Sequence, residues 1–461
     1  MTRLTPLDAG FLEVEDSDPH VSLAIGGVAI LAGPMPDPDT LLSTLEQRMT
    51  VCPRFRQRLR RYPLDVAAPE WVDDPDFDLT RHVRRIALPR PGTERDLYEV
   101  IADIMSWRLD RNHPLWEIWA IEGLSDNRWA VLMKVHHCVA DGIATVNMLA
   151  GLSDGGPGET FADQLRTGTA RRTEQANPDR PALRLPLTPL SVVRAGLRVG
   201  RGVRDLAAGL LRSAPSPLNG PVSDLRRYSA ARVRLDDVRR VCRAFDVTIN
   251  DVALAALTES YRTLLLQRGV QPLSDALRTL VPVSVRPPDA SGAADNRVSL
   301  MLPCLPVDVG DPVQRLLAVH DRMSRSKSSG QHEAGHAVTS IADLIPFALT
   351  AQAVRFLVRL PQRGVVSVAT NVPGPKRPLQ VLGRPVLAVL PVPPIAMQLR
   401  IGVAILSYAD QLSFGILADF DTVPDIDDFA RGIETAVRRL VRCSRRSRTR
   451  PRNGLTLVAS N

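Results

Sequence analysis

Two adjacent histidines at the end of an apolar run are the residues of this 461-residue chain best suited to proton transfer. The run 129–137 is rich in Val and Leu and ends in His136 and His137, a pattern that predicts a buried strand. Neighbouring side chains of a strand point to opposite faces, so only one ring can reach a given substrate atom if strand geometry persists to the end. By this alternation His137 shares the face of Val131 and Val135 and emerges from an apolar wall. An imidazole there can take a proton from a hydroxyl, which as general-base catalysis is worth roughly 10²–10⁴-fold.

Asp141 and Gly142 follow the histidines after a short turn. Gly142 lets the chain bend tightly, and the residues after it have the apolar spacing of a helix. A carboxylate at Asp141 could fix this turn, or it could fix the tautomer of a histidine. On spacing alone, the stretch fits a buried histidine pair beside an N-terminal helix cap as well as it fits a catalytic base.

A second histidine motif, HEAGH at 332–336, satisfies H-E-x-x-H. On a helix, its two histidines would share one face and bind zinc, with Glu333 as the base of a metallopeptidase. Gly335 weakens that helix, and no acid or histidine at a familiar distance downstream stands out as a third ligand. The sequence therefore favours a solvated helix over a zinc site.

The stretch 151–155 matches G-x-S-x-G, the pattern of a serine hydrolase. A nucleophile elbow needs a strand before the serine and a helix after it, whereas Ser153 follows a helix-like run and precedes a Gly- and Pro-rich segment. This order favours a turn that ends a helix. The sequence lacks P-loop and G-x-G-x-x-G patterns, which disfavours nucleotide hydrolysis.

The basic charge of the chain lies mostly in one short stretch near its C-terminus. The formal net charge is +8, and the stretch 438–452 holds eight arginines and no acid, which leaves the remainder formally neutral. We expect a disordered, Arg-rich tail over 441–461, whose charge could also attract anionic lipid. Because aromatic residues make up only 4%, we do not expect a base-stacking surface for nucleic acid.

Cysteine usage and the N-terminal sequence indicate a reducing compartment. The five cysteines are odd in number, widely spaced and never in a C-x-x-C pair, which predicts neither a disulfide framework nor a thiolate zinc site. The N-terminus lacks the pattern of a signal peptide, and no run of about 18 apolar residues occurs. We therefore expect a cytoplasmic protein without a membrane-spanning helix.

Changes in composition divide the chain into two α/β domains joined by a linker. The first domain is expected over 1–155 and the second over 226–440, where a capping-box pattern at 248–251 opens a helix and 399–419 forms a hairpin. The linker, 156–225, contains arginines spaced as in a basic amphipathic helix, namely Arg194, Arg198, Arg201 and Arg204. This helix either packs on the protein or attaches to a membrane surface.

The histidine pair and its surroundings resemble a known family of acyltransferases. H-H-x-x-x-D-G is the signature of enzymes related to chloramphenicol acetyltransferase and the nonribosomal-peptide condensation domain. More specifically, the chain resembles the bacterial wax ester synthase/acyl-CoA:diacylglycerol acyltransferase (WS/DGAT) family in a series of blocks that occur in one order. These are LTPLDAGFL at 4–12, WVDDP at 71–75, PLWE at 114–117, PLNGP at 217–221, ND at 250–251, VPVSVR at 281–286 and TNVPGP at 370–375.

The resemblance implies two chloramphenicol-acetyltransferase-like domains, each a mixed sheet flanked by helices, with a tunnel at their interface. It implies that His137 is the general base, that no covalent intermediate forms, and that His136 and Gly142 are structural. The motif's Asp pairs in this family with an Arg at the end of a second-domain strand, so Asp141 is expected to pair with Arg286.

Two further blocks are assigned to the substrate site by the same resemblance. Asn250 and Asp251 match the Asn-Asp motif of the family, where they either open a helix or make a polar contact near the reacting carbonyl. The block that contains Pro114, Leu115 and Trp116 is expected to pack or to line the tunnel without taking part in the chemistry.

The expected activity is esterification of diacylglycerol, and of long-chain alcohols as a second acceptor, by acyl-CoA. Acyl-CoA is then a co-substrate, and no cofactor or metal is expected. The expected partners are these lipids and the surface of the inner membrane face or of lipid bodies, with no nucleic acid. Two alternatives remain, a zinc metallopeptidase that uses HEAGH and a catalytically idle protein that binds lipid surfaces.

Overall fold

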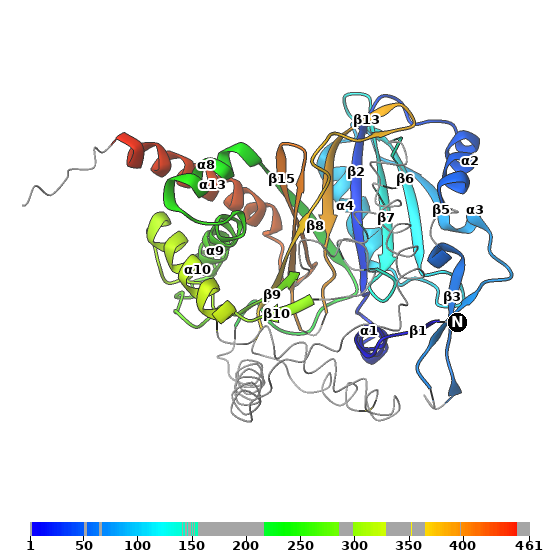
Figure 1. Cartoon of the computed structure of the whole chain (residues 1–461), viewed down its shortest axis with the longest axis horizontal. Helices are drawn as coiled ribbons and strands as arrows, with labels where there is room; N and C mark the ends of the chain where they lie inside the picture. Colours follow the sequence, from blue (N-terminus) through cyan, green and yellow to red (C-terminus); the bar gives the residue numbers. More distant parts are fainter. Residues whose placement is uncertain are drawn as a thin grey trace, which may run out of the picture.

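Two six-stranded sheets stand beside each other at the centre of the molecule, with helices on their outer sides (Figure 1). The computed structural model describes residues 2–49, 53–63, 67–140, 216–284, 298–328, 365–396 and 398–449, and a few residues between them: 142, 145, 149, 151, 153, 154 and 352.

The elements of the first half are β1 (Thr2–Arg3), α1 (Pro6–Ser17), β2 (Ala24–Ala32), α2 (Pro38–Met49), a 3₁₀ turn (Pro53–Arg56), β3 (Gln57–Arg60), β4 (Glu70–Asp73), α3 (Leu79–His82), β5 (Val83–Ala87), α4 (Glu94–Ser106), β6 (Trp116–Leu124) and β7 (Arg128–His136). Those of the second half are β8 (Arg226–Arg234), α8 (Leu235–Phe245), α9 (Ile249–Gln267), β9 (Thr279–Ser284), β10 (Val298–Met301), α10 (Pro312–Ser328), β11 (Ser367–Pro373), β12 (Gln380–Val381), β13 (Arg384–Val392), β14 (Ile401–Tyr408), β15 (Gln411–Asp419) and α13 (Ile426–Thr449).

The first sheet has the strand order β12-β13-β2-β7-β6-β5 and places β7 near its centre. Its pairs are antiparallel except for β5 with β6, so the sheet is mixed. β7 reads as a continuous apolar run because both of its faces are covered: even-numbered residues pack toward α1 and α4, and odd-numbered ones toward α2.

The second sheet has the order β10-β9-β11-β14-β15-β8 and is also mixed, since β11 is parallel to β9 and β14. Helices α8, α9, α10 and α13 cover its outer face, where their apolar side chains form the larger core cluster. The expected fold, two α/β units that each contain a mixed sheet flanked by helices, is confirmed. The expected hairpin is also confirmed, as β14 and β15 pair antiparallel from Ile401 with Ala418 to Tyr408 with Gln411.

The second half of the chain contributes two strands to the first sheet. β13 pairs antiparallel with β2 along most of its length, and β12 extends the same edge. The domain predicted over 226–440 therefore includes residues 380–392, which belong to the sheet of the first half. Alternation within a strand shows which face is buried but not which sheet the strand joins, so the sequence pattern contained no sign of this exchange.

Polar contacts also join the two halves. α4 lies between the sheets and packs on β8, where Glu94 accepts a hydrogen bond of 2.5 Å from Arg232. Tyr228 of β8 donates a hydrogen bond to the carbonyl oxygen of Pro391 in β13 (3.0 Å). The interface is thus held by apolar packing together with a few directed bonds.

The tail expected from 441 onward begins within a helix. α13 continues to Thr449, and Val441 and Ser444 are buried on its inner face. The arginines dominate the composition here, but the apolar residues between them keep helical spacing, and cations near a helix C-terminus are favourable.

Candidate active site

Helix α1 begins at a sequence signal that fixes its start. The side-chain oxygen of Thr5 accepts a hydrogen bond from the backbone N–H of Asp8 (3.1 Å), and Pro6 occupies the first helical position. From this start, Phe11 and Glu15 lie four residues apart and therefore on one face of the helix. The histidine pair contacts both of these side chains.

Strand β7 presents the histidine pair from the middle of the first sheet. The backbone N–H of His136 donates to the carbonyl oxygen of Leu115, and that of His137 donates to the carbonyl oxygen of Leu23, each at 3.0 Å. One bond thus goes to the segment before β6 and the other to the segment before β2. The backbone of the pair is held from both sides.

His136 is buried, with 1% of its side chain exposed. Its Nδ1 accepts a hydrogen bond from the backbone N–H of Cys138 (3.1 Å), and its Nε2 lies 3.3 Å from Oε2 of Glu15. The ring therefore bridges the turn after β7 and helix α1. A ring enclosed in this way does not face a substrate.

Glu15 is a buried carboxylate whose negative charge is stabilised by several partners. Oε2 accepts a hydrogen bond from Arg111 (2.6 Å), and Oε1 accepts one from the backbone N–H of Leu23 (3.0 Å). Burial alone would raise its pKa, but His136, Arg111 and the Leu23 N–H together lower the pKa to about 2. Glu15 is therefore ionised at neutral pH.

His137 is half-buried and stacks on Phe11. The ring centroids are 4.2 Å apart with an interplanar angle of 24°. β7 ends at His136, so the turn decides where the next ring points, and the strand alternation that we used does not apply to it. Phe11 packs with the cluster of Leu132, whereas Val131 and Val135 belong to the cluster on the other face. The expectation that His137 shares their face is wrong for this reason.

Cys138 lies inside the motif but is not a nucleophile. The residue is buried, and burial raises the pKa of its thiol well above the ordinary value. Its backbone N–H serves to orient His136.

Gly142 lies against strand β11 of the other sheet. A Cβ added to Gly142 would come within 3.2 Å of Cγ2 of Val372, which belongs to the TNVPGP block. The histidine motif and this block are thus neighbours across the two halves. Asp141 and Arg286, expected to form a salt bridge, both lie outside the described residues.

The Asn-Asp pair opens helix α9, as the capping-box pattern predicts. Asp251 accepts bonds from the backbone N–H and the hydroxyl of Thr248, and its Oδ2 lies 2.8 Å from Nδ1 of His320. Asn250 accepts a hydrogen bond from the side-chain amide of Asn371 in β11 (3.3 Å). Two of the sequence blocks therefore meet at the start of this helix.

The PLWE block packs in the core of the first half. Pro114, Leu115 and Trp116 are buried, and the indole N–H of Trp116 donates to the carbonyl oxygen of Phe55 (3.0 Å). Leu115 also accepts the bond from His136 described above. In the structure these residues support the histidine strand.

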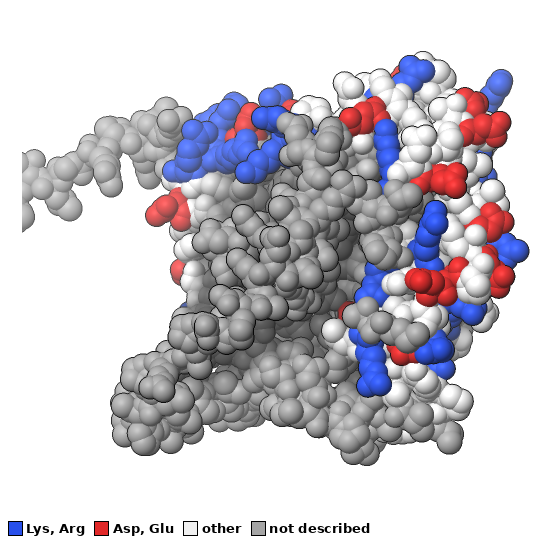
Figure 2. All heavy atoms as spheres, turned by 45° about the vertical axis from the view of Figure 1, so that its right-hand side comes forward, with Lys and Arg blue, Asp and Glu red and all other residues white. Residues whose placement is uncertain are grey.

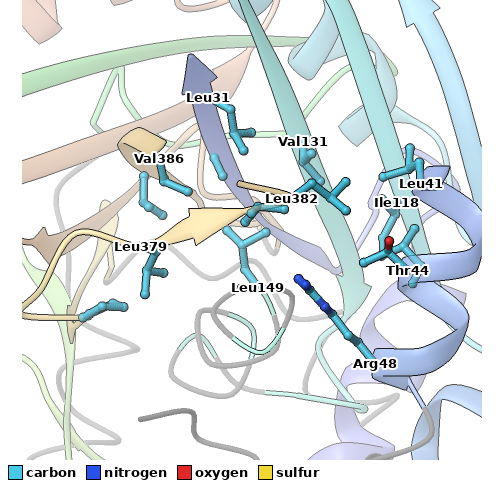
Figure 3. Close-up of a pocket in the computed structure, with 15 residues that line it drawn as sticks. Leu31, Leu41, Thr44, Arg48, Ile118, Val131, Leu149, Leu379, Leu382 and Val386 are labelled. Carbon is cyan, nitrogen blue, oxygen red and sulfur yellow. The ribbon is translucent and has the colours of Figure 1, made fainter. Parts of the chain in front are cut away.

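An apolar pocket lies on the face of the first sheet that α2 covers (Figure 3). It is lined mainly by aliphatic side chains from β2, β7, α2, β13 and the segment that precedes β13. Arg48 lies at its edge and pairs with Asp154 at 2.7 Å. Val131, in its wall, is six residues before His137, or about 20 Å along the strand.

Comparison with known proteins places this arrangement in a family. Residues 4–253 match the model of the wax ester synthase/diacylglycerol acyltransferase catalytic domain, and residues 294–441 match the WS/DGAT C-terminal domain. The chain belongs to the WS/DGAT family. It is 59% identical to the Mycobacterium tuberculosis H37Rv protein named "Probable diacyglycerol O-acyltransferase tgs1", over 99% of this chain and all of that relative.

Solved structures agree with this family and with its fold. The wax ester synthase/diacylglycerol acyltransferase of Marinobacter aquaeolei VT8 superposes with a TM-score of 0.69 at 27% identity, covering 96% of this chain and all of that one. The TRI3 trichothecene 15-O-acetyltransferase of Fusarium sporotrichioides superposes with a TM-score of 0.64 at 12% identity, covering 95% and 94%, which shows the shared fold alone. The resemblance drawn from the sequence blocks is confirmed, and the chain is an acyltransferase of this family.

Membership in the WS/DGAT family leaves the zinc-peptidase alternative without support. The HEAGH motif at 332–336 and the linker helix that contains Arg194 lie outside the described residues. In the described part of the chain, no three His, Cys, Asp or Glu side chains come together as metal ligands would. Among the helices that the structure describes, none is long and apolar enough to span a bilayer.

Proposed function

We propose that this WS/DGAT member transfers the acyl group of an acyl-CoA to diacylglycerol, with His137 as general base. The observation that carries this proposal is the position of the ring, half-buried at the end of the central strand of the first sheet and stacked on Phe11. The name of the 59%-identical relative supports diacylglycerol as the acceptor, and that of the Marinobacter structure supports long-chain alcohol as a second acceptor.

In the proposed reaction, His137 removes the proton of the acceptor hydroxyl while its oxygen attacks the thioester carbonyl. The tetrahedral oxyanion then collapses, the C–S bond breaks, and the protonated imidazole returns the proton to the CoA thiolate. The products are triacylglycerol and free CoA, and no group of the protein is acylated. Under this proposal, His136 and Gly142 shape the motif, and an Asp141–Arg286 salt bridge holds the two halves together around the base.

The apolar pocket beside α2 is proposed to receive a hydrocarbon chain. Aliphatic side chains line it, and burial of a chain yields about 0.8 kcal/mol per CH₂. Because the pocket lies on the α2 side of the sheet and His137 stacks on the α1 side, the chain would have to pass around the end of β7 to reach the base. A tunnel between the halves would connect the two places.

A direct assay tests the proposed chemistry. Purified full-length protein is given labelled acyl-CoA with diacylglycerol or with a long-chain alcohol, and labelled ester and released CoA are measured. We expect His137→Ala to lower kcat by at least about 100-fold, the lower range for a lost general base. The control is His113→Ala, a partly exposed histidine of the same half that pairs with Asp74. Undiminished turnover in His137→Ala would contradict the assignment.

We also propose a peripheral contact with an anionic lipid surface through the C-terminal part of α13. From Val437 onward this helix contains arginine but no acid, and Arg438, Arg439, Arg442, Arg445 and Arg446 are exposed. Figure 2 shows a group of basic side chains at the end of the molecule where Figure 1 places α13. Polybasic segments gain about 1 kcal/mol per Lys or Arg near such a surface.

Vesicle binding tests this contact. Replacement of Arg442, Arg445 and Arg446 by Gln should weaken binding to phosphatidylglycerol vesicles roughly 100-fold and leave binding to phosphatidylcholine vesicles unchanged. The control carries the same three changes at Arg81, Arg84 and Arg95, exposed arginines of the first half. Equal loss in the two variants would show a general charge effect and contradict the proposed surface.

A further inference from the structure

Glu15 contacts both of the segments that hold His137 in place. Oε1 accepts the backbone N–H of Leu23, and the carbonyl oxygen of Leu23 accepts the backbone N–H of His137 (3.0 Å each). Oε2 lies 3.3 Å from Nε2 of His136, the residue before His137 in the chain. A single carboxylate therefore fixes the neighbour of His137 in sequence and its neighbour in the sheet.

The contacts of His136 also define its tautomer. Nδ1 accepts the backbone N–H of Cys138, which places the ring proton on Nε2, 3.3 Å from Oε2 of Glu15. If the proton moved to Nδ1, it would face the backbone N–H of Cys138, and only Sγ of Cys138, 3.0 Å from Nδ1, could accept it. The charge of Glu15 opposes this exchange, and thereby keeps the turn that presents His137 in one geometry.

The surroundings of Glu15 keep its carboxylate in one position. Its side chain is 1% exposed, and Arg111, which also pairs with Asp16, holds Oε2 at 2.6 Å. Phe11, one turn earlier on the same helix, contacts the ring of His137 itself. Helix α1 therefore supports the base directly through Phe11 and indirectly through Glu15.

We propose that Glu15 is a positioning residue for the general base, acting through His136 and Leu23 without touching the substrate. This inference rests on the proposed role of His137. Because a misplacement of about 1 Å can cost about 100-fold in rate, the orientation of the ring is where such a residue exerts its effect.

The test compares Glu15→Gln with Glu13→Gln. Glutamine keeps an oxygen for the Leu23 N–H but presents an NH₂ group to the Nε2–H of His136 and to Arg111, so donors face donors. We expect kcat to fall about 10- to 100-fold, with the KM for acyl-CoA within about twofold of wild type. Glu13 is also buried on the same helix and pairs with Arg61 at 3.7 Å, so its variant should keep the wild-type kcat. Both variants are assayed at a temperature well below their thermal unfolding midpoints.

The outcomes separate this inference from the function on which it rests. A Glu15→Gln enzyme that is less stable but has the wild-type kcat per folded molecule overturns the positioning role. If His137→Ala is fully active, the proposed role of His137 as general base is contradicted, whatever the result for Glu15→Gln. If His137→Ala loses activity but Glu15→Gln keeps the wild-type kcat, His137 remains the proposed base and the positioning role of Glu15 is contradicted.

A measurement on the wild-type protein keeps the inference testable even if Glu15→Gln does not fold. The ¹⁵N resonances of the His136 ring, assigned by their absence in His136→Gln, should show that the neutral ring is protonated at Nε2 and unprotonated at Nδ1. An Nδ1-protonated ring in the wild type would contradict the inference.

Discussion

The imidazole of His137 lies 4.2 Å from the ring of Phe11, nearly parallel to it. The contact joins the end of the central strand of the first sheet to the first helix of the chain, which are more than 120 residues apart in sequence. Since His137 has left the strand, this contact and its backbone bond to Leu23 decide the direction of the ring. The proposed proton acceptor of this WS/DGAT member is therefore oriented by α1 as much as by its own strand.

Replacement of Phe11 by Leu should lower kcat by about threefold to tenfold. Leucine keeps most of the apolar volume but loses the stacked ring, and an aromatic pair contributes about 0.5–1.5 kcal/mol beyond its buried area. Steady-state kinetics with acyl-CoA and diacylglycerol measure the change. The matched control is Phe77→Leu, because Phe77 stacks on His82 in the same half at 5.4 Å and the same 24°. Equal effects of the two variants on kcat would argue against a specific role for Phe11.

Glu15 should make the acid stability of the protein depend on pH between about 4.5 and 2. Its pKa is about 2 in the folded protein against an ordinary value of 4.5, so the unfolded chain binds the proton more tightly. The stabilisation is therefore complete above about pH 4.5 and is lost as the pH falls toward 2, an effect on the order of 3 kcal/mol. Urea unfolding of wild type and Glu15→Gln across this range measures it. Their free energies of unfolding should converge at low pH, and a constant difference would contradict the assignment.

Much of the fold could be predicted from local patterns. The capping-box pattern at 248–251 marked the start of α9, and the apolar run that ends in the histidines marked β7, because caps and buried strands depend on a few adjacent residues. The exchange of β13 into the first sheet could not be predicted this way. Its pairing with β2 joins residues over 350 positions apart, and nothing within β13 specifies that partner.

The site was predicted less completely than the fold. The motif named both histidines, yet strand alternation gave the wrong surroundings for His137, since a turn follows His136 directly. Phe11 and Glu15 were missed because their role depends on where α1 docks. A signal was present, since Thr5 and Pro6 mark a helix start and place the two residues one turn apart. The spacing of Phe11 and Glu15 showed that they share one face of the helix, but not that this face contacts the histidine pair.

Replacement of Thr44 by Phe should shift the acyl preference toward shorter chains. Thr44 lies on α2 in the wall of the apolar pocket and is partly exposed, so a larger side chain there narrows the pocket without overfilling the core (Figure 3). Each CH₂ that no longer fits loses about 0.8 kcal/mol, roughly fourfold in kcat/KM. Competition between acyl-CoAs of different length measures the shift. Ser43→Phe, exposed at the next position of the helix, serves as control, and an unchanged preference in Thr44→Phe would place the chain elsewhere.

Loss of the Glu94–Arg232 pair should weaken the contact between the two halves. Glu94 of α4 is partly buried; burial alone would raise its pKa, but hydrogen bonds from Arg232 and Arg128 lower it. Arg232→Met leaves the carboxylate with less compensation, and we expect a loss of about 1–3 kcal/mol in the free energy of unfolding. Arg95→Met, which removes an exposed pair with Glu99 on the same helix, should cost less than about 0.5 kcal/mol. Denaturant unfolding compares the two variants, and similar losses would show that α4 gains nothing special from contact with β8.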